Sequence, residues 1–295
     1  MVIRIFKIVL LGLSCFLAAC QNSTSDNVSS LSDTAITIRS LGSSIAYTDT
    51  KKGDTTLLFI HGWGIHKGYW DNQIDYFKDR YRVVAIDLPG YGESGNTART
   101  WGPETYVQDI DSIADALQLK NVILIGHSMS GATVVEAGVK YPGRFVGIVG
   151  VDNMKDVDME TTPEMMEQWK LFYQAAKKDF KGSIMGGINA LFASTTDSLI
   201  RERVTNDILS SDTTMTLECL EAMDKYPFAT KLPLLKQPVF LIESTYVPTD
   251  TAAFTKLGIA YKFYDMGNVG HYPMLEDRRR FNNLLEQVIH ACGKH

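Results

Sequence analysis

The chain has 295 residues, of which 45% are hydrophobic and 21% are charged, and its formal net charge is −5. The length suits one large α/β domain with room for an insertion. A negative net charge without any Lys/Arg-rich stripe argues against a nucleic-acid partner. Cysteines and histidines do not cluster with metal-ligand spacing, so the sequence predicts no metal site.

The N-terminus has the pattern of an export signal. Arg4 and Lys7 precede an apolar stretch over residues 8–19. This stretch is shorter than the ~20 residues that a membrane-spanning helix needs. It fits the apolar part of a secretory signal peptide.

The segment LAAC at 17–20 resembles a bacterial lipobox. The resemblance implies that 1–20 is a lipoprotein signal peptide and that an acylated Cys20 then holds the protein at a membrane. Gln21 is compatible with the outer membrane of a bacterial cell envelope. The alternative is an ordinary signal peptide with an incidental cysteine. Residues 21–33 contain few apolar side chains and are expected to form a flexible tether.

Strands and helices are predicted in alternation along the remaining chain. Strands are expected at 34–40, 43–48, 55–60, 81–86, 121–126, 145–151, 238–242 and 261–266. Helices are expected near 68–78, from Pro103 to about Leu117, at 131–140 and in the last segment. This order predicts a mostly parallel sheet that helices cover on both faces.

The segment 154–233 lacks a strand pattern and interrupts this order, so we expect a helical insertion between the core segments 34–153 and 234–295. Its many methionines suit either a packed helical core or a lid over an apolar pocket. Two helix faces are expected, one formed by Met166, Trp169, Tyr173 and Ala176 and the other by Leu199, Ile200, Val204 and Ile208.

Four motifs follow predicted strands: HGWG at 61–64, DLPGYGES at 87–94, GHSMSG at 126–131 and GHYPMLE at 270–276. In this order they resemble the α/β-hydrolase family, and the resemblance extends from Thr34 to the C-terminus. It implies the α/β-hydrolase fold, with 154–233 as a helical cap or lid. The chain departs from a strict G-x-S-x-G motif, because Ser130 stands at its last position and Gly131 follows.

Ser128 occupies the position of the nucleophile in this resemblance. A serine on a sharp strand-to-helix turn is exposed at the sheet edge, and a histidine must take its proton before it can attack. The resemblance assigns the oxyanion hole to the backbone N–H groups of Trp63 and Met129. Among six histidines, His271 in GHYPMLE matches the family's base. His61 has a loop-shaping role in the resemblance.

The acid of the triad has two candidates. Many family members carry an aspartate in the loop after the strand that corresponds to 238–242, but Val247 precedes Pro248 at that place. Asp152 directly follows the strand at 145–151, and some relatives, including certain haloalkane dehalogenases, supply the acid there. We favour Asp152 and keep Asp250 as the alternative.

Other interpretations of single motifs are weaker. GYGESG at 90–95 matches G-x-G-x-x-G, but a dinucleotide site should open a helix directly after a strand, and this segment lies in a long loop. No cofactor is therefore expected. Ser128 argues against the epoxide hydrolases and haloalkane dehalogenases, which attack with aspartate. Cys219 and Cys292 could pair in an oxidising compartment or remain buried thiols.

The sequence as a whole predicts a lipid-anchored serine hydrolase of small to medium, largely uncharged esters. Ser128 attacks the ester carbonyl, His271 takes the proton, and water hydrolyses the acyl-enzyme. The alternatives are an amidase, a carbon–carbon bond hydrolase with the same triad, and a non-catalytic binding protein on the same fold. The oligomeric state and the physiological substrate cannot be read from the sequence.

Overall fold

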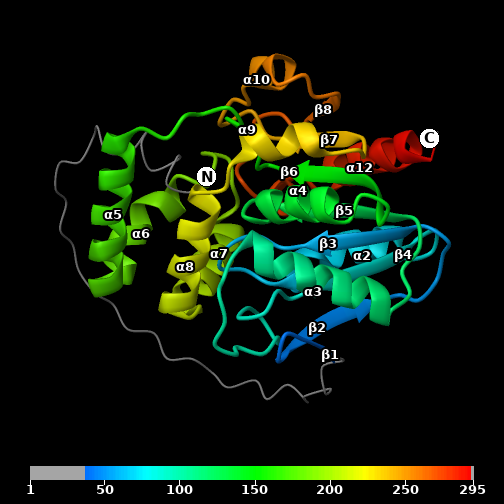
Figure 1. Cartoon of the computed structure of the whole chain (residues 1–295), viewed down its shortest axis with the longest axis horizontal. Helices are drawn as coiled ribbons and strands as arrows, with labels where there is room; N and C mark the ends of the chain where they lie inside the picture. The colour runs from blue at the N-terminus through cyan, green and yellow to red at the C-terminus, as the bar shows by residue number, and fades with distance from the viewer. Residues whose placement is uncertain (1–36, 294–295) are drawn as a thin grey trace.

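The computed structural model describes residues 37–293, so the signal peptide, Cys20 and the tether lie outside it. Within this range eight strands form one sheet (Figure 1). In space they run β1-β2-β4-β3-β5-β6-β7-β8; β2 is antiparallel to both neighbours and the other pairs are parallel. Their bounds are Thr37–Ser40 (β1), Ser43–Asp49 (β2), Thr56–Ile60 (β3), Arg82–Ile86 (β4), Val122–His127 (β5), Phe145–Val151 (β6), Val239–Glu243 (β7) and Tyr261–Asp265 (β8). The predicted mostly parallel sheet is confirmed.

The central strands are buried because helices cover both faces of the sheet. Strands β3, β5 and β7 are buried along their whole length, as expected for near-continuous apolar runs in a parallel sheet. One face carries α3 (Pro103–Ala116) and α4 (Ser130–Lys140), and the other carries α2 (Asp71–Phe77) and α12 (Arg278–Cys292) (Figure 1). The short elements η1 (Lys67–Trp70), α10 (Thr251–Lys256) and α11 (Pro273–Glu276) lie in the connections.

A helical insertion, which we define as residues 163–231, lies between β6 and β7. Its helices are α5 (Pro163–Lys178), α6 (Phe180–Asn189), α7 (Ser198–Ser210), α8 (Thr213–Asp224) and α9 (Phe228–Lys231), followed by η2 (Leu232–Leu234). Figure 1 shows α5 to α8 grouped at one end of the sheet. Trp63 follows β3 and donates its indole N–H to the carbonyl of Thr216 on α8, at 2.7 Å. The insertion therefore covers the carboxyl ends of the strands.

The predicted helix faces within the insertion are only partly correct. Trp169, Tyr173 and Ala176 are buried as expected, but Met166 is 53% exposed. On α7, Leu199 is 73% exposed, although Val204 and Ile208 are buried. The apolar stripe of each helix thus continues beyond the part that its neighbours cover.

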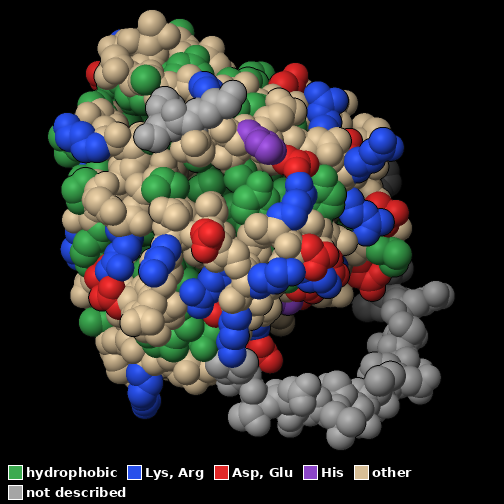
Figure 2. Space-filling view, turned by 90° about the vertical axis from the view of Figure 1, so that its right-hand side faces the viewer, with side chains coloured by type: hydrophobic (Ala, Val, Ile, Leu, Met, Phe, Trp, Pro, Cys, Tyr) green, Lys and Arg blue, Asp and Glu red, His purple; other side chains and the backbone are tan. Residues whose placement is uncertain are grey.

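The structure also shows the charge distribution on one face and the state of the two thiols. Figure 2 shows acidic and basic side chains interspersed over the face turned away from the insertion. Cys219 and Cys292 are both buried and both free, and they do not pair. No helix of the described chain is long and apolar enough to cross a membrane.

Candidate active site

The register of the central strands places side by side two residues whose backbone has the left-handed conformation. His127, the last residue of β5, pairs with Val151, the last residue of β6. The next residue on each strand is Ser128 with φ 54° and Asp152 with φ 49°. A positive φ is uncommon for a residue with a side chain and often marks a functional turn. Each turn holds its side chain at the carboxyl edge of the sheet.

Glycines make the tight turn at Ser128 possible. A Cβ on Gly126 would lie 2.7 Å from the carbonyl oxygen of Ser130, and one on Gly131 would lie 2.6 Å from Cγ of Asn153. Asn153 in turn donates to the carbonyl of Gly126 at 2.7 Å. The first turn of α4 therefore packs directly against the ends of β5 and β6, with its positive N-terminus beside Ser128. Gly131 serves this packing although it lies one place beyond the strict motif.

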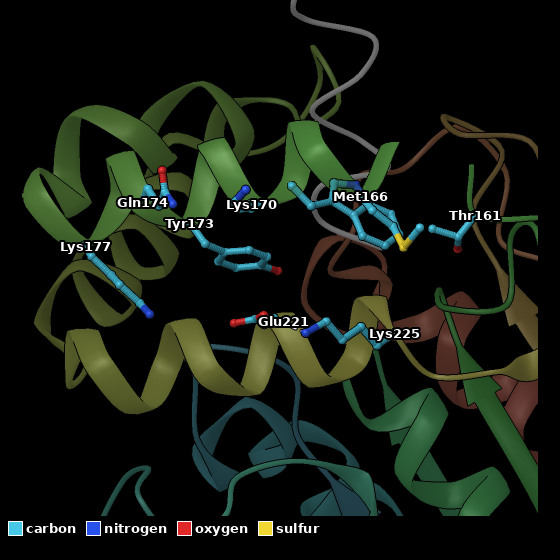
Figure 3. A pocket seen from close by; sticks show the side chains of 9 residues that line it. Thr161, Met166, Lys170, Tyr173, Gln174, Lys177, Glu221 and Lys225 are labelled. Atoms are coloured by element: carbon cyan, nitrogen blue, oxygen red, sulfur yellow. Dashed lines mark hydrogen bonds and ion pairs between the residues drawn. The ribbon is translucent and has the colours of Figure 1, made fainter. Parts of the chain in front are cut away.

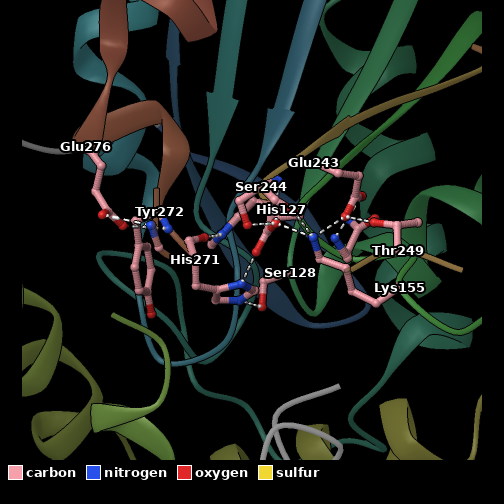
Figure 4. Close-up of polar contacts among 12 residues, drawn as sticks. His127, Ser128, Lys155, Glu243, Ser244, Thr249, His271, Tyr272 and Glu276 are labelled. Atoms are coloured by element: carbon pink, nitrogen blue, oxygen red, sulfur yellow. Dashed lines mark hydrogen bonds and ion pairs between the residues drawn. The ribbon is translucent and has the colours of Figure 1, made fainter. Parts of the chain in front are cut away.

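Ser128, His271 and Asp152 form one hydrogen-bonded chain (Figure 4). The Ser128 hydroxyl lies 2.7 Å from Nε2 of His271, and Nδ1 of His271 lies 2.6 Å from Oδ2 of Asp152. Ser128 is 4% exposed, His271 is 2% exposed and Asp152 is fully buried. This arrangement allows the imidazole to take a proton from the serine while the carboxylate orients it.

The other oxygen of Asp152 is also saturated with donors. Oδ1 accepts bonds from the backbone N–H of Ser244 at 2.9 Å and from its hydroxyl at 2.6 Å, and Nζ of Lys155 lies 2.7 Å away. Burial acts to raise the pKa of Asp152, but the Lys155 charge and the bond to His271 hold that pKa well below its usual range. The carboxyl is therefore ionised at neutral pH.

Asp250, the alternative acid, has a different place in the structure. Its carboxylate accepts hydrogen bonds from the backbone N–H groups of Ala252 and Ala253. It thereby caps the N-terminus of α10. The structure brings Asp152 to His271 and leaves Asp250 on the surface.

Two backbone N–H groups close to Ser128 are free to receive an oxyanion. Neither Trp63 N–H nor Met129 N–H has an acceptor within residues 37–293. The loop that carries Trp63 lies close to the serine, because a Cβ on Gly62 would come within 2.9 Å of Cβ of Ser128. The hydroxyl of Ser130 ties this loop to α4 by donating to the carbonyl of His61 at 2.5 Å.

The neighbouring histidines support the site as neutral rings. His127 donates from Nε2 to the carbonyl of His271 at 2.7 Å. His61 accepts from the N–H of Leu88 at 3.0 Å and donates to the carbonyl of Gly62. Burial lowers the pKa of His61 to about 4 and that of His127 to about 3. Neither ring competes with His271 for the proton of Ser128.

The loop around His271 is fixed by contacts that the sequence motif does not reveal. Glu276 accepts from the N–H of Gly270 at 2.9 Å and from that of Tyr272 at 3.3 Å. Between them, the N–H of His271 donates to the carbonyl of Leu191 in the insertion at 2.7 Å. Lys155, Glu243, Ser244 and Glu276 were not among the site residues predicted from the sequence; only Glu276 lies within a recognised motif.

The glycine-rich segment at 90–95 allows the loop in which it lies to fold tightly. It lies between β4 and α3, and its folding around Asp87 is tight, since a Cβ on Gly92 would lie 2.4 Å from the Asp87 carboxylate. Asp87 accepts from the N–H of Glu93 and pairs with Lys67 at 2.9 Å. The segment does not open a helix, which a dinucleotide site would require. In the range 37–293, acidic, histidine and cysteine side chains also form no cluster that would hold a metal ion.

A cavity of about 600 Å³ is lined by residues of the insertion and by Thr161 just before it, and does not lie at Ser128. Figure 3 shows it between α5 and α8, where Tyr173 points from α5 toward α8 and Lys177 and Lys225 lie at its margins. The near-complete burial of Ser128 and His271 means that this structure presents the site in a covered state.

Comparison with known proteins agrees with this geometry. The model of a family described as "Alpha/beta hydrolase family" matches residues 57–284. A 2-hydroxy-6-oxononadienedioate/2-hydroxy-6-oxononatrienedioate hydrolase from Paraburkholderia phymatum is 27% identical, covering 82% of this chain and 89% of that protein. 3-Oxoadipate enol-lactonase 2 from Acinetobacter baylyi is 21% identical, covering 79% and 88%.

Solved structures show the same fold at lower identity. The esterase EaEST from Exiguobacterium antarcticum superposes with a TM-score of 0.76 and 19% identity, covering 86% of this chain and 99% of that one. The family match extends over most of the described residues, from within β3 to within α12. The chain is therefore a hydrolase that belongs to the α/β-hydrolase family.

Proposed function

We propose that this hydrolase cleaves small to medium, largely uncharged esters through a covalent acyl-enzyme. The hydrogen-bonded chain Ser128–His271–Asp152 carries the proposal. In it the serine attacks the ester carbonyl, His271 takes the serine proton and returns it to the leaving alcohol, and Asp152 stabilises the charged imidazole.

The free N–H groups of Trp63 and Met129 complete this mechanism as the oxyanion hole. Preorganised donors of this kind typically contribute about 3 kcal/mol each to the stabilisation of the transition state. Water activated by His271 then hydrolyses the acyl-enzyme. No step needs a metal or an organic cofactor.

The surroundings of the serine favour an uncharged substrate. Trp63, Tyr91 and Met129 are buried apolar neighbours of the turn, and the Tyr91 hydroxyl lies 3.8 Å from the Met129 sulfur. Phe180 of the insertion approaches Trp63 with 6.4 Å between ring centroids. An apolar acyl or alcohol group would replace these contacts when the insertion moves aside to admit it.

Carbon–carbon bond hydrolysis is the second candidate, since four relatives at 26–27% identity are named as hydrolases of 2-hydroxy-6-oxononadienedioate and 2-hydroxy-6-oxononatrienedioate, whose keto groups are carbonyls that are not esters. Those names describe dicarboxylate substrates, which call for cationic groups at the site. Lys155 is the cation in contact with Asp152, and its ammonium already has three acceptors: Asp152, Glu243 and the carbonyl of Ser244. This favours an ester over a dicarboxylate.

The proposal is tested with the full chain in detergent by hydrolysis of p-nitrophenyl acetate. We expect turnover that Ser128→Ala reduces by at least about 10³-fold, while the exposed-site control Ser210→Ala keeps the wild-type rate. Equal residual rates in the wild type and Ser128→Ala, with both proteins folded, would contradict the serine mechanism. Faster cleavage of a β-diketone than of any ester would favour the second candidate.

We also propose that Cys20 carries the lipid anchor, on the basis of the lipobox-like segment at 17–20. Acyl chains on this residue would place the hydrolase at the bacterial outer membrane, consistent with Gln21. Incorporation of labelled palmitate into the wild type but not into Cys20→Ala would support this. Equal labelling of both proteins, or of neither, would contradict it.

A further inference from the structure

A buried cluster of charged groups lies directly behind the Ser128–His271–Asp152 chain. We call Asp152, Lys155, Glu243 and Ser244 the Lys155 cluster; Figure 4 labels its last three residues. Nζ of Lys155 contacts Oδ1 of Asp152 at 2.7 Å, Oε2 of Glu243 at 2.9 Å and the carbonyl oxygen of Ser244 at 2.8 Å. An ammonium group has three protons, and each has an acceptor here.

The cluster connects the ends of β6 and β7, after which the sequence analysis placed the two alternative acids of the triad. Asp152 and Lys155 follow β6, whereas Glu243 ends β7 and Ser244 follows it. Val151 pairs with Ile242 in the sheet, so the side chains of Asp152 and Glu243 emerge from neighbouring strands at the same level. Lys155 bridges the two carboxylates.

All three charged groups of the cluster are buried. Lys155 is 7% exposed, and Asp152 and Glu243 are fully buried. Burial opposes the charge on Lys155, but Glu243 and Asp152 outweigh it and raise the pKa of that ammonium above its usual value. A buried ion pair of this kind persists only when its remaining hydrogen-bonding groups are satisfied.

The hydrogen-bonding partners of Glu243 favour its ionised form. Burial raises the pKa of Glu243 above its usual value, and the Lys155 charge opposes this shift. The contacts of its two oxygens in the described chain are all donors: the N–H groups of Asn153 and Met154, the hydroxyl of Thr249 and the ammonium of Lys155. A proton on this carboxyl would have to displace one of them.

We propose that Lys155 and Glu243 are positioning residues that set how much negative charge Asp152 presents to His271, and thereby the pH at which Ser128 becomes reactive. This inference rests on the proposed function. The positive charge of Lys155 offsets part of the negative charge on Asp152 and so makes the imidazolium form of His271 less favourable. Glu243 partly cancels Lys155 and restores the stabilisation of the imidazolium.

The histidine and tyrosine side chains near His271 are neutral and therefore add no charge to that of the Lys155 cluster. His127 on β5 lies with its ring centroid 4.9 Å from that of His271 and is neutral, as described above. Burial raises the pKa of Tyr246, in the loop after β7, and of Tyr272, so both phenols are neutral. Glu276 faces the backbone N–H groups beside His271 and accepts from them.

The experiment compares Glu243→Gln and Lys155→Met with the wild-type full chain. The titration of His271 is followed by the ¹⁵N resonances of its ring, assigned by their loss in His271→Gln. Glu243→Gln leaves the Lys155 charge uncompensated, so the midpoint should move to lower pH by on the order of one unit. Lys155→Met should move it to higher pH.

The reaction with a fluorophosphonate ester connects this titration to Ser128. The serine oxygen bonds to phosphorus, fluoride leaves, and His271 takes the serine proton. The acid limb of the reaction rate should shift with the titration midpoint in each variant. The control is Glu286→Gln on α12, which removes a carboxylate that contacts Tyr76 on α2 and Arg80 in the turn after α2. This variant should leave both midpoints unchanged.

The outcomes separate this inference from the proposed function. Opposite shifts in the two variants support it, because general damage to the fold would not reverse sign. An unchanged midpoint in Glu243→Gln overturns it, even if Lys155→Met fails to fold. Opposite ¹⁵N shifts together with a serine that the probe never labels would support the electrostatic role and overturn the serine mechanism.

Discussion

Thr196 in the helical insertion donates a hydrogen bond to Oε2 of Glu276 in the loop that carries His271, at 2.5 Å. The same carboxylate holds the N–H groups on either side of His271. Arg201 fixes the turn before α7 by donating to the carbonyl of Thr196 at 3.0 Å. The position of the insertion and the position of the histidine are therefore linked through one carboxylate.

This link predicts that removing the Thr196 hydroxyl impairs the chemical step. Thr196→Val keeps the shape of the side chain but leaves Glu276 without one donor. We expect kcat for p-nitrophenyl acetate to fall roughly tenfold at nearly unchanged KM, since a buried bond to a charged group contributes about 1.5–3 kcal/mol. Thr196→Ser should restore kcat. An unchanged kcat with a raised KM would instead assign the contact to substrate binding alone.

The choice of acid predicts a large difference between two aspartates. Asp152→Asn keeps the size of the side chain but removes the charge that orients and stabilises His271, so kcat should fall by about 10⁴-fold. Asp250→Asn should retain wild-type kcat, because asparagine also caps a helix well. Steady-state rates of the two purified variants provide the test. A loss confined to Asp250→Asn would reverse the assignment.

The close approach of the Trp63 loop predicts that Gly62 tolerates no side chain. An alanine Cβ there would lie 2.6 Å from Nδ1 of His127 and 2.9 Å from Cβ of Ser128. The loop must shift, and Trp63 N–H moves away from the oxyanion. We expect kcat of Gly62→Ala to fall by at least about 10²-fold. Gly143→Ala, where a Cβ meets nothing within 4 Å, is the control. Equal kcat in the two variants would exclude an oxyanion role for this loop.

Much of the fold was predictable because its strands are continuous apolar runs. The expected segments at 145–151 and 238–242 differ from β6 and β7 by at most one residue at either end. Ser128 and His271 could be identified because each lies in a short motif after a strand. Both motifs owe their form to local constraints, namely the tight turn at Ser128 and the close contacts of Gly270 with Glu276 and Leu191.

The surroundings of these residues could not be predicted, because they depend on which loops meet in space. Lys155 lies in a polar stretch that is typical of a surface loop, yet the meeting of the β6 and β7 loops buries it. Thr196 and Glu276 are 80 positions apart. Met166 continues an apolar helix face, but it is 53% exposed, and no element within residues 37–293 covers it fully. Periodicity gives the direction of a side chain on its helix and not the extent of the partner surface.

Because His61 and His127 are neutral in the folded protein, we expect the free energy of unfolding to decrease as the pH is lowered. This decrease begins in a range where the carboxylates remain ionised. His61 and His127 have pKa values of about 4 and about 3 in the folded protein, below the usual value of 6.5. As the pH falls, these rings are protonated in the unfolded chain before they are protonated in the folded protein. Their contribution to the free energy of unfolding is therefore complete above pH 6.5 and declines as the pH falls toward 4. At pH 5 the loss is about 2 kcal/mol for each ring.

Urea unfolding of the wild type at pH 8 and at pH 5 measures this loss as a difference in the free energy of unfolding. His127→Gln removes one of these two rings, so its difference between the two pH values should be smaller than that of the wild type by about 2 kcal/mol. His290→Gln, which replaces an exposed ring on α12, should retain the wild-type difference. The same difference in the wild type and His127→Gln would mean that His127 is charged in the folded protein. Its Nε2 proton would still reach the His271 carbonyl, but a second positive charge would then lie beside the imidazolium that the mechanism requires.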